Sequence, residues 1–241
     1  MNTQMVFERY EIKYLLDERQ KEKVLRAMEP YMEPDRFGRS TIRNIYYDTD
    51  DYRLIRKSLE KPVYKEKLRV RSYRQSRAED SVFVELKKKY RDIVYKRRIA
   101  LPEGRASEYL TGRGKAPVRT QITDEIDYFL TFYQNLAPRV FLSYEREAYF
   151  DRERKDFRVT FDENILWRET DLSLLKGVYG ESILRQGQTL MELKTSGGIP
   201  LWMAQVMSEE KIRKTSFSKY GNAYERRMKL AEETDRRVYS A

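Results

Sequence analysis

The chain has 241 residues, of which 37% are charged and 40% hydrophobic, and it contains neither Cys nor His. Disulfides, zinc-thiolate sites, His-ligated metals, a Ser-His-Asp triad and any Cys or His catalyst are therefore excluded. The net charge of +10 at pH 7 predicts an anionic partner, such as a nucleic acid, a phosphorylated metabolite, polyphosphate or a membrane surface. A bound metal would depend on oxygen ligands, which favours Mg²⁺ or Mn²⁺.

The sequence also bears on the location and organisation of the chain. No run approaches the ~20 apolar residues that cross a bilayer, and the N-terminus lacks an apolar signal segment. Because the absence of Cys suits a reducing compartment, we expect a soluble, cytoplasmic protein without membrane insertion. We also expect residues 1–241 to form a single domain, since no repeat, low-complexity block or linker interrupts them.

Hydrophobic periodicity predicts the elements of the first half of the chain. In chain order, these are a strand at 6–16, a helix from Asp17 to Pro30, a strand at 41–48, a short helix at 49–59, and strands at 63–74, 81–90 and 93–101. Short polar connections between the last three strands are typical of antiparallel hairpins. The glycine-rich residues 104–117 are expected to form a loop with a short helix at 107–110, suited to act as a mobile lid.

The second half alternates strands and helices. In chain order, we expect a helix at 120–136, strands at 139–150 and 158–163, a helix at 172–178, strands at 182–185 and 189–196, and helices at 201–208 and 219–233. About eight strands with few helices favour an α+β, β-rich fold built on a closed antiparallel eight-stranded β-barrel, or tunnel, with peripheral helices. Closure is expected because it removes exposed strand edges.

Charged side chains recur at every second position of several expected strands. These sets are Lys65, Lys67, Arg69 and Arg71; Glu85, Lys87 and Lys89; Lys96 and Arg98; Arg158 and Asp162; and Glu192 and Lys194. Because successive side chains of a strand point to opposite faces, each set occupies one face, while Val82, Val84 and Leu86 occupy the other. A solvent-exposed sheet face alternates in the same way, but it usually mixes acids with bases. The excess of Lys and Arg predicts that several strands converge on an anion.

The sequence has no glycine-rich phosphate-binding loop. Its one Gly-Lys pair, Gly114 and Lys115, is followed by Ala116 and lacks the upstream glycine of the Walker motif. A Walker-type NTPase is therefore disfavoured. Phosphate would have to be held by Arg and Lys side chains on rigid strands.

Short motifs in a fixed order along the chain carry a resemblance to a known family. They are Glu11 and Lys13; Lys67, Arg69 and Arg71; Glu85 and Lys87; Lys96 and Arg98; Tyr144 and Arg146; Arg158 before Asp162; Glu192 and Lys194; and Ser216, Ser218 and Lys219. Together, over nearly the whole chain, they resemble the VTC domain, the polyphosphate polymerase branch of the CYTH or triphosphate tunnel metalloenzyme superfamily.

The resemblance implies a basic β-tunnel in which the γ-phosphoryl of ATP passes to a growing polyphosphate chain with the help of Mn²⁺ or Mg²⁺. The implied catalytic residues are Lys13, Arg69, Arg71, Lys87, Arg146, Arg158 and Lys219. The implied phosphate- or nucleotide-binding residues are Lys67, Lys96, Arg98, Tyr144, Lys194, Ser216 and Ser218. The implied metal ligand is Glu192, with Glu85 and Glu11 as helpers. Such a site suits a chain without His, because phosphoryl transfer depends mainly on positioning and charge neutralisation.

The expected partners are ATP and inorganic polyphosphate rather than DNA, and the oligomeric state stays open. Two departures from the family pattern keep other activities in view. Ser216 stands where yeast-type proteins have a basic residue, so that phosphate contact could move to Lys214. Arg9 replaces an acidic residue of the superfamily's opening motif, which disfavours a two-metal triphosphatase. The alternatives are an inorganic triphosphatase or nucleoside triphosphatase in the same tunnel, and a non-catalytic polyphosphate- or RNA-binding protein.

Some of these residues also have a purely structural interpretation. Glu85 and Glu192 could be salt-bridge partners of cations on neighbouring strands. Tyr46, Tyr47 and Asp48 are expected to belong to packing and to a turn rather than to catalysis.

Overall fold

A computed structural model of the chain describes residues 10–239, apart from 92, 117 and 155. Its strands are β1 (Tyr10–Leu16), β2 (Met32–Pro34), β3 (Ser40–Asp48), β4 (Tyr64–Ser72), β5 (Ser81–Tyr90), β6 (Ile93–Pro102), β7 (Ala137–Asp151), β8 (Arg158–Arg168), β9 (Glu181–Ser182), β10 (Thr189–Thr195) and β11 (Lys214–Thr215). Its helices are α1 (Glu18–Met28), α2 (Arg53–Leu59), α3 (Glu103–Leu110), α4 (Gln121–Tyr133), α5 (Leu201–Glu209) and α6 (Lys219–Tyr239). The α+β, sheet-rich class predicted from the sequence is confirmed.

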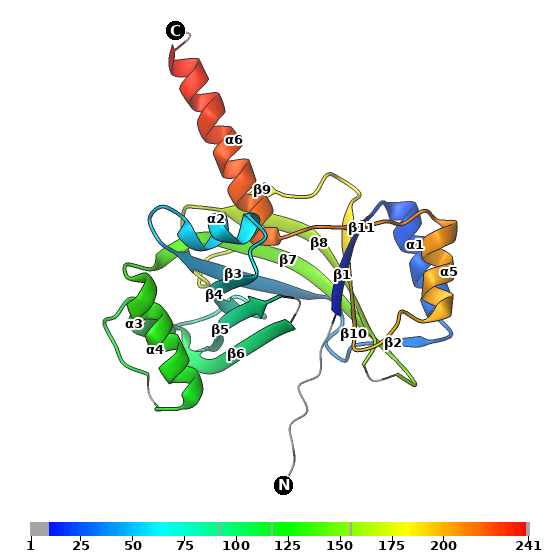
Figure 1. Cartoon of the computed structure of the whole chain (residues 1–241), viewed down its shortest axis with the longest axis horizontal. Coiled ribbons are helices and arrows are strands. Elements are labelled where there is room, and N and C mark those ends of the chain that lie inside the picture. The colour runs from blue at the N-terminus through cyan, green and yellow to red at the C-terminus, as the bar shows by residue number, and fades with distance from the viewer. Residues whose placement is uncertain (1–9, 92, 117, 155, 240–241) are drawn as a thin grey trace.

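All of these strands join one antiparallel sheet, whose outer face is covered by α1, α3, α4 and α5 (Figure 1). The apolar face of β5, with Val82, Val84 and Leu86 fully buried, packs against α3 and α4. The apolar faces of β1, β8 and β10 pack in the same way against α1 and α5. A third cluster joins β3 and β7 to α2 and to the start of α6. Because the apolar faces are covered by helices, the charged faces of the long strands point to the inside of the curved sheet.

The sheet bends strongly but does not close in the part of the chain that is described. Its hydrogen-bonded order is β11-β1-β10-β8-β7-β3-β4-β5-β6, with β2 on β7 and β9 on β8. Shifts of register at Tyr46/Tyr47 and at Ser143/Glu145 allow the curvature. The eight long strands match the expected ones, whereas the predicted closed eight-stranded barrel is not confirmed. Between the two halves of the sheet, a side-chain ion pair 3.0 Å long joins Lys87 on β5 to Glu11 on β1, and no backbone ladder joins these two strands in the described residues.

Most predicted helices are confirmed, and one is wrong. Asp17 caps α1 in a capping box with Gln20, as the sequence indicated. The helix expected at 172–178 is absent, and this segment is a loop. Arg168 explains the loop, because its guanidinium binds the backbone carbonyls of Thr170, Asp171 and Tyr179 and so holds the chain in a non-helical path. The strand expected at 182–185 shrinks to β9, and residues 6–9 of the first expected strand lie outside the described residues.

Among the described helices, none has both the length and the apolar character required to cross a membrane. The glycine-rich stretch predicted as a loop begins with α3, which is two turns long and buries Ala106, Tyr109 and Leu110. Its second half is irregular over residues 111–116.

Asp48, the last residue of β3, connects this strand to α2 and to α6. Its fully buried carboxylate accepts hydrogen bonds from the backbone N–H groups of Leu54 and Ile55, at the start of α2, at 2.9 and 3.0 Å. It also accepts one from the hydroxyl of Tyr220 in α6, at 2.9 Å. Asp48 is therefore structural, in agreement with the sequence-based interpretation. The same side chain stabilises the position of α6, whose first residues enter the inner face of the sheet.

Replacing Asp48 should destabilise the fold. Asp48→Ala leaves two helix N–H groups and a tyrosine hydroxyl without their acceptor in a buried place, so we expect a loss of roughly 3 kcal/mol in the free energy of unfolding. Asp51→Ala removes a nearby but exposed carboxylate that pairs with Arg56, and it should leave the melting temperature close to that of the wild type. Equal melting temperatures for the two variants would contradict this role of Asp48.

Candidate functional site

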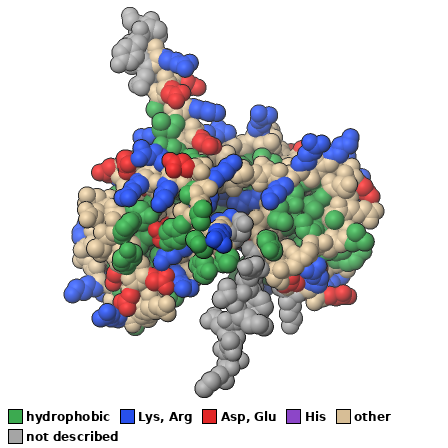
Figure 2. Space-filling view, in the orientation of Figure 1, with side chains coloured by type: hydrophobic (Ala, Val, Ile, Leu, Met, Phe, Trp, Pro, Cys, Tyr) green, Lys and Arg blue, Asp and Glu red, His purple; other side chains and the backbone are tan. Residues whose placement is uncertain are grey.

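The charged faces of the long strands meet on the inside of the sheet. We call this set of side chains the inner cluster. Its cations are Lys13, Lys67, Arg69, Arg71, Lys87, Lys96, Arg98, Arg146, Arg158, Lys194 and Lys219, and its carboxylates are Glu11, Glu85, Asp162 and Glu192. Figure 2 shows Lys and Arg side chains gathered in the recess between the two lobes of the molecule. Cations outnumber carboxylates, so the cluster carries a strong positive charge.

Glu85 on β5 is the most heavily paired carboxylate of the inner cluster. It is 1% exposed, and its oxygens lie 2.7 Å from Arg69 and 2.7 Å from Lys96, in contact with Arg98, and 3.9 Å from Arg71. Burial raises the pKa of Glu85, but Arg69, Arg71 and Lys96 outweigh it and bring the pKa well below its usual range. With its oxygens already engaged by four cations, Glu85 fits the salt-bridge interpretation better than that of a metal ligand.

Asp162 on β8 is a second buried carboxylate, and sequence reasoning did not select it as a site residue. Arg146 binds both of its oxygens, at 2.5 and 2.6 Å, and Lys219 at the start of α6 donates to it at 2.5 Å. Burial raises its pKa, but Lys219 and Arg146 reverse this effect and the net shift is downward. Asp162 therefore fixes two cations from different elements. The signal for it was present, since Asp162 stands on the same face of its strand as Arg158.

Neutral side chains orient the arginines of β4. Arg71 donates to the amide oxygen of Asn44 at 2.9 Å and to the hydroxyl of Tyr144 at 3.0 Å, while Arg69 donates to the hydroxyl of Tyr46 at 3.0 Å. Asn44 was missed as a site residue because its side chain is uncharged, and Tyr46, which the sequence assigned to packing, also contacts the site through its hydroxyl. Both lie on β3 directly opposite the arginines, in a register that the sequence alone does not show.

Tyr144 lies against several cations. Lys219 sits 4.5 Å above its ring centroid and Arg146 sits 5.1 Å above it. Burial raises the pKa of Tyr144, but Arg71, Arg146 and Lys219 bring it down to about 8. The cations of this region thus stabilise even a phenolate, which shows how strongly it favours negative charge.

Besides Asp162, two carboxylates, Glu192 and Glu11, occupy the half of the inner cluster formed by β1, β8 and β10. Glu192 on β10 stands opposite Lys13 of β1 in the strand register, and Glu11 is its diagonal neighbour on the same face. Burial raises the pKa of Glu192, but Lys194, Lys13 and Lys219 bring it well below its usual range. In the described residues, no group of three or more carboxylates gathers in a way that could hold a metal by itself.

Lys13 and Lys67 are the least neutralised cations of the inner cluster. Lys13 donates to the backbone carbonyl of Phe217 at 2.8 Å, and Lys67 to the hydroxyl of Ser218 at 2.9 Å. Burial lowers the pKa of Lys67 to about 7, and the nearby Lys13 contributes to the shift. Burial likewise lowers the pKa of Lys13 to about 8, although Glu192 opposes the shift. An anion placed between these ammonium groups would relieve their repulsion.

Ser218 connects the inner cluster to α6. Its hydroxyl accepts a hydrogen bond from the backbone N–H of Gly221 at 3.1 Å and so caps the first turn of the helix. The N-terminal end of α6 therefore faces the inner cluster and adds its partial positive charge. Ser216, two residues earlier, is exposed, as is Lys214.

The remaining predicted residues lie at the ends of the inner cluster. Arg158 pairs with Asp35 at 3.1 Å, and Lys87 pairs with Glu11 across the gap between the halves. Lys194 lies 3.7 Å from Glu192. The structure thus brings together the predicted residues from β1, β4, β5, β6, β7, β8, β10 and α6, and Ser216 stands apart.

Two solved structures share the fold of this chain. One, from Bacillus halodurans and described as a candidate adenylate cyclase, superposes with a TM-score of 0.54 and 14% identity over 88% of this chain and 95% of its own. Another, a candidate adenylyl cyclase from Hippeastrum reported to have a dominant triphosphatase activity, gives a TM-score of 0.51 and 16% identity over 87% of this chain and 92% of its own. The chain therefore has the same fold as these two proteins.

A comparison with models of protein families identifies the family of the chain. The family model of the VTC domain matches residues 8–227, so the chain belongs to the VTC domain family, as the ordered motifs suggested. A search among curated proteins finds no significant match.

Removing the charge of Glu85 should leave four cations to repel one another. We expect Glu85→Gln to lower the free energy of unfolding by roughly 3 kcal/mol, because an ion pair in a buried place loses its partner. Tripolyphosphate should restore part of the melting temperature, since it supplies negative charge to the same region. Glu125→Gln is the matched control: Glu125 also pairs with two cations, Lys88 and Arg97, but on the outer surface, where we expect a loss below about 1 kcal/mol. A Glu85 variant as stable as the control would contradict this role.

Anion binding should be coupled to proton uptake. Near pH 8, Lys67 with a pKa of about 7 is mostly neutral and Lys13 with a pKa of about 8 is half neutral. A bound anion raises both pKa values, so tripolyphosphate should bind with net proton uptake near pH 8 and with little uptake near pH 6, where both groups already carry their proton. Affinity should accordingly fall as the pH rises through this window. Calorimetric titrations in buffers of different ionisation enthalpy measure the uptake.

Lys67→Met provides the control for that experiment. The ligand's own protonation is the same with either protein, so the difference between wild type and variant reports on Lys67. Identical proton uptake by the two proteins would show that Lys67 keeps its charge in the free protein.

Proposed function

We propose that this protein is a polyphosphate polymerase that transfers the γ-phosphoryl of ATP to a growing inorganic polyphosphate chain along the inner cluster. The observation that carries the proposal is the pair of poorly neutralised lysines, Lys13 and Lys67, in a cluster where cations outnumber carboxylates. A linear chain of phosphates is a ligand that matches a long row of cations on several strands. Membership of the VTC domain family supports this choice of anion.

The reaction requires little covalent chemistry from the protein. A terminal oxygen of the polyphosphate chain attacks the γ-phosphorus of ATP and forms a new P–O bond. The bond from that phosphorus to the bridging β–γ oxygen breaks, and ADP leaves with the electron pair. The protein has to align the two reactants and to neutralise the charge on the phosphoryl oxygens.

Some inner-cluster residues bind the phosphates, and others position the residues that do. Lys13, Lys67 and Lys87 bind phosphate oxygens as mobile point charges, while Arg69, Arg71 and Arg146 bind them from rigid positions. Glu85, Asp162 and Asn44 hold those arginines in place and do not touch the substrate. Because the cations are positioned before the substrate arrives, little rearrangement is needed during transfer.

A divalent metal fits the half of the cluster formed by β1, β8 and β10. Glu192 and Glu11 offer carboxylate oxygens there, and the hydroxyl of Thr160, paired with Glu192 across the sheet, is buried without a hydrogen-bond partner among the described residues. Mg²⁺ and Mn²⁺ accept such oxygen donors and take their remaining ligands from phosphates and water. A metal bound there would neutralise negative charge on the phosphoryl oxygens. Glu85 is not part of this group.

The second candidate function is hydrolysis of triphosphate at the same cluster. It is favoured by the fold shared with the Hippeastrum protein, which is reported to have a dominant triphosphatase activity. The replacement of an acidic residue by Arg9 counts against a two-metal hydrolytic site. The two activities differ in their acceptor, which is a phosphate chain in one and water in the other.

The test is the product distribution after incubation with ATP and Mn²⁺. We expect the wild type to produce phosphate chains longer than the triphosphate of ATP, and Glu192→Ala to reduce that rate by about 10²-fold or more, as for the loss of one preorganised charge-stabilising group. The control, Glu147→Ala, removes a carboxylate from the opposite face of β7 and should leave the rate unchanged. Orthophosphate without polymer would support the triphosphatase instead, and the absence of both products would contradict either activity.

A further inference from the structure

Tyr73 extends the row of inner-cluster residues on β4 beyond the last arginine. It follows Lys67, Arg69 and Arg71 at the same spacing of two, one residue after the strand ends. The other tyrosines that bind these arginines, Tyr46 and Tyr144, are buried, whereas Tyr73 is 44% exposed. Tyr73 is thus an aromatic residue at the solvent-exposed end of this row, and packing in the core does not account for its presence there.

The ring of Tyr73 is held in place by Arg98 of β6 and by Phe83 of β5. Its hydroxyl accepts a hydrogen bond from Arg98 at 3.0 Å, and its ring meets that of Phe83 edge-on, with centroids 5.7 Å apart and planes at 75°. Arg98 in turn lies 4.4 Å from the ring centroid of Phe83 and pairs with Glu85. With 44% of its surface exposed, Tyr73 keeps ring surface available for stacking.

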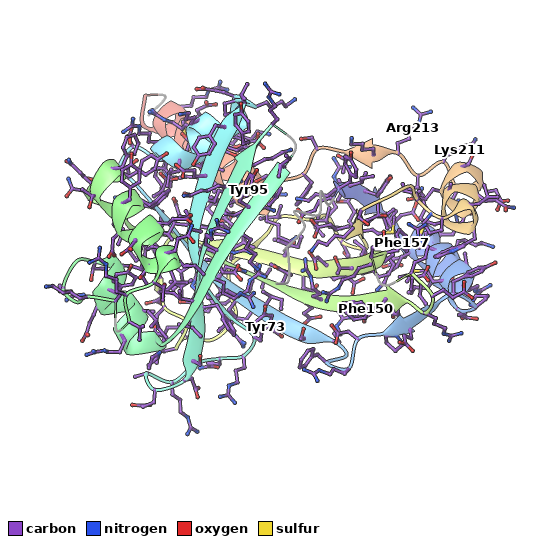
Figure 3. All side chains as sticks on the ribbon, turned by 60° about the horizontal axis from the view of Figure 1, so that its bottom comes forward. Tyr73, Tyr95, Phe150, Phe157, Lys211 and Arg213 are labelled. Atoms are coloured by element: carbon purple, nitrogen blue, oxygen red, sulfur yellow. The ribbon has the colours of Figure 1, made fainter. Side chains whose placement is uncertain are left out.

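A second aromatic and arginine pair lies at the same end of the inner cluster. On β7 and β8, Arg158 sits 4.5 Å above the ring centroid of Phe150 and pairs with Asp35. The pKa of Arg158 is lowered by burial first of all, and among the groups that oppose this shift are Asp35 and the phenol of Tyr73. Tyr73 thus binds Arg98 of one half of the sheet, and its phenol acts electrostatically on Arg158 of the other half. Figure 3 labels Tyr73 at the end of β4 and Phe150 on β7.

The opposite end of the row has a different character. Tyr73 is followed inward by arginines, and Lys67 lies six positions away, about 20 Å along an extended strand. Around Lys67 are Lys13, Lys65 and Lys87. The row thus begins with an exposed aromatic ring beside two arginines and ends among lysines, which matches a molecule with an aromatic group at one end and phosphates along the rest.

We infer that Tyr73 is the stacking platform for the nucleobase of the nucleoside triphosphate, with the phosphates running inward past Arg98 and Arg158 towards Lys67. This inference rests on the proposed function for the triphosphate itself and adds the place and the chemistry of nucleoside recognition. Because every base offers a flat π-face to an aromatic ring, the platform binds purine nucleotides without strong discrimination, so ATP and GTP bind alike.

The test compares nucleotides with a ligand that lacks the base. In calorimetric titrations, Tyr73→Ala should weaken the binding of ATP and of GTP about 10-fold, the usual effect of losing one stacked aromatic ring. The same variant should bind inorganic tripolyphosphate within about 2-fold of the wild type, since no phosphate contact is lost. Tyr73→Phe keeps the ring but not the hydroxyl, and it should retain most of the affinity for ATP.

Tyr95→Ala is the matched control. Tyr95 is similarly exposed, at 37%, but it lies on the outer face of β6, opposite to Lys96 and Arg98, so its removal should change neither affinity (Figure 3). Equal weakening of ATP and tripolyphosphate by Tyr73→Ala would overturn the inference and show that Tyr73 acts through Arg98. No weakening of either ligand would overturn it as well.

Two results for the wild type separate this inference from the function on which it rests. Binding of tripolyphosphate but not of ATP or GTP would overturn nucleoside recognition and leave the phosphate-binding role intact. Binding of none of the three ligands would overturn both.

Discussion

Like charges that are held side by side repel one another, and the inside of this sheet holds more cations than its carboxylates neutralise. Two unit charges about 4 Å apart interact by about 4 kcal/mol at the effective dielectric of a protein near its surface. Glu85 and Asp162 offset much of this repulsion for the arginines of β4, β6 and β7. They do not neutralise Lys13 and Lys67, whose pKa values are lowered first by burial and further by neighbouring cations. The site, the coupling of binding to protons and the choice of ligand all depend on this imbalance.

The outside of the sheet makes such an arrangement stable. The helices α3 and α4 at one end of the sheet, and α1 and α5 at the other, bury the outer, apolar faces of the strands that carry the cations. Each large side chain buried in this way contributes about 1.5–3 kcal/mol to the free energy of unfolding. Packing from outside therefore holds the strands in place against the repulsion inside. Because Glu85, Asp162 and Asn44 hold the arginines of these strands, a phosphate chain meets guanidinium groups that are already oriented. Asp48, Ser218 and the start of α6 extend this rigid frame to the end of the inner cluster.

The predictable part of the site was the part with a local pattern. A spacing of two placed Lys67, Arg69 and Arg71 on one face, and the structure has them there, because the alternation of a strand is decided by neighbouring residues. Asn44 was missed, although it orients Arg71, because an uncharged residue breaks the charge pattern and its contact depends on the register between β3 and β4. The prediction of a helix at 172–178 was wrong for a similar reason. Backbone carbonyls beside this segment bind Arg168, a tertiary contact that helical spacing does not reveal.

The sequence by itself determined the sign of the charge, the face of each long strand that carries it, and the exclusion of His and Cys chemistry, because composition and alternation are properties of the chain alone. Only the tertiary structure decided which cations are neutralised and which are not. Glu85 and Glu192 look alike in sequence, each two residues before a lysine, yet one is surrounded by cations of β4 and β6 and the other faces Lys13 beside Glu11. The structure also decided that a side-chain ion pair, and not a backbone ladder, links β1 to β5 in the described residues. These outcomes depend on distances between strands far apart in the chain, and electrostatic energy varies with such distances rather than with the order of residues.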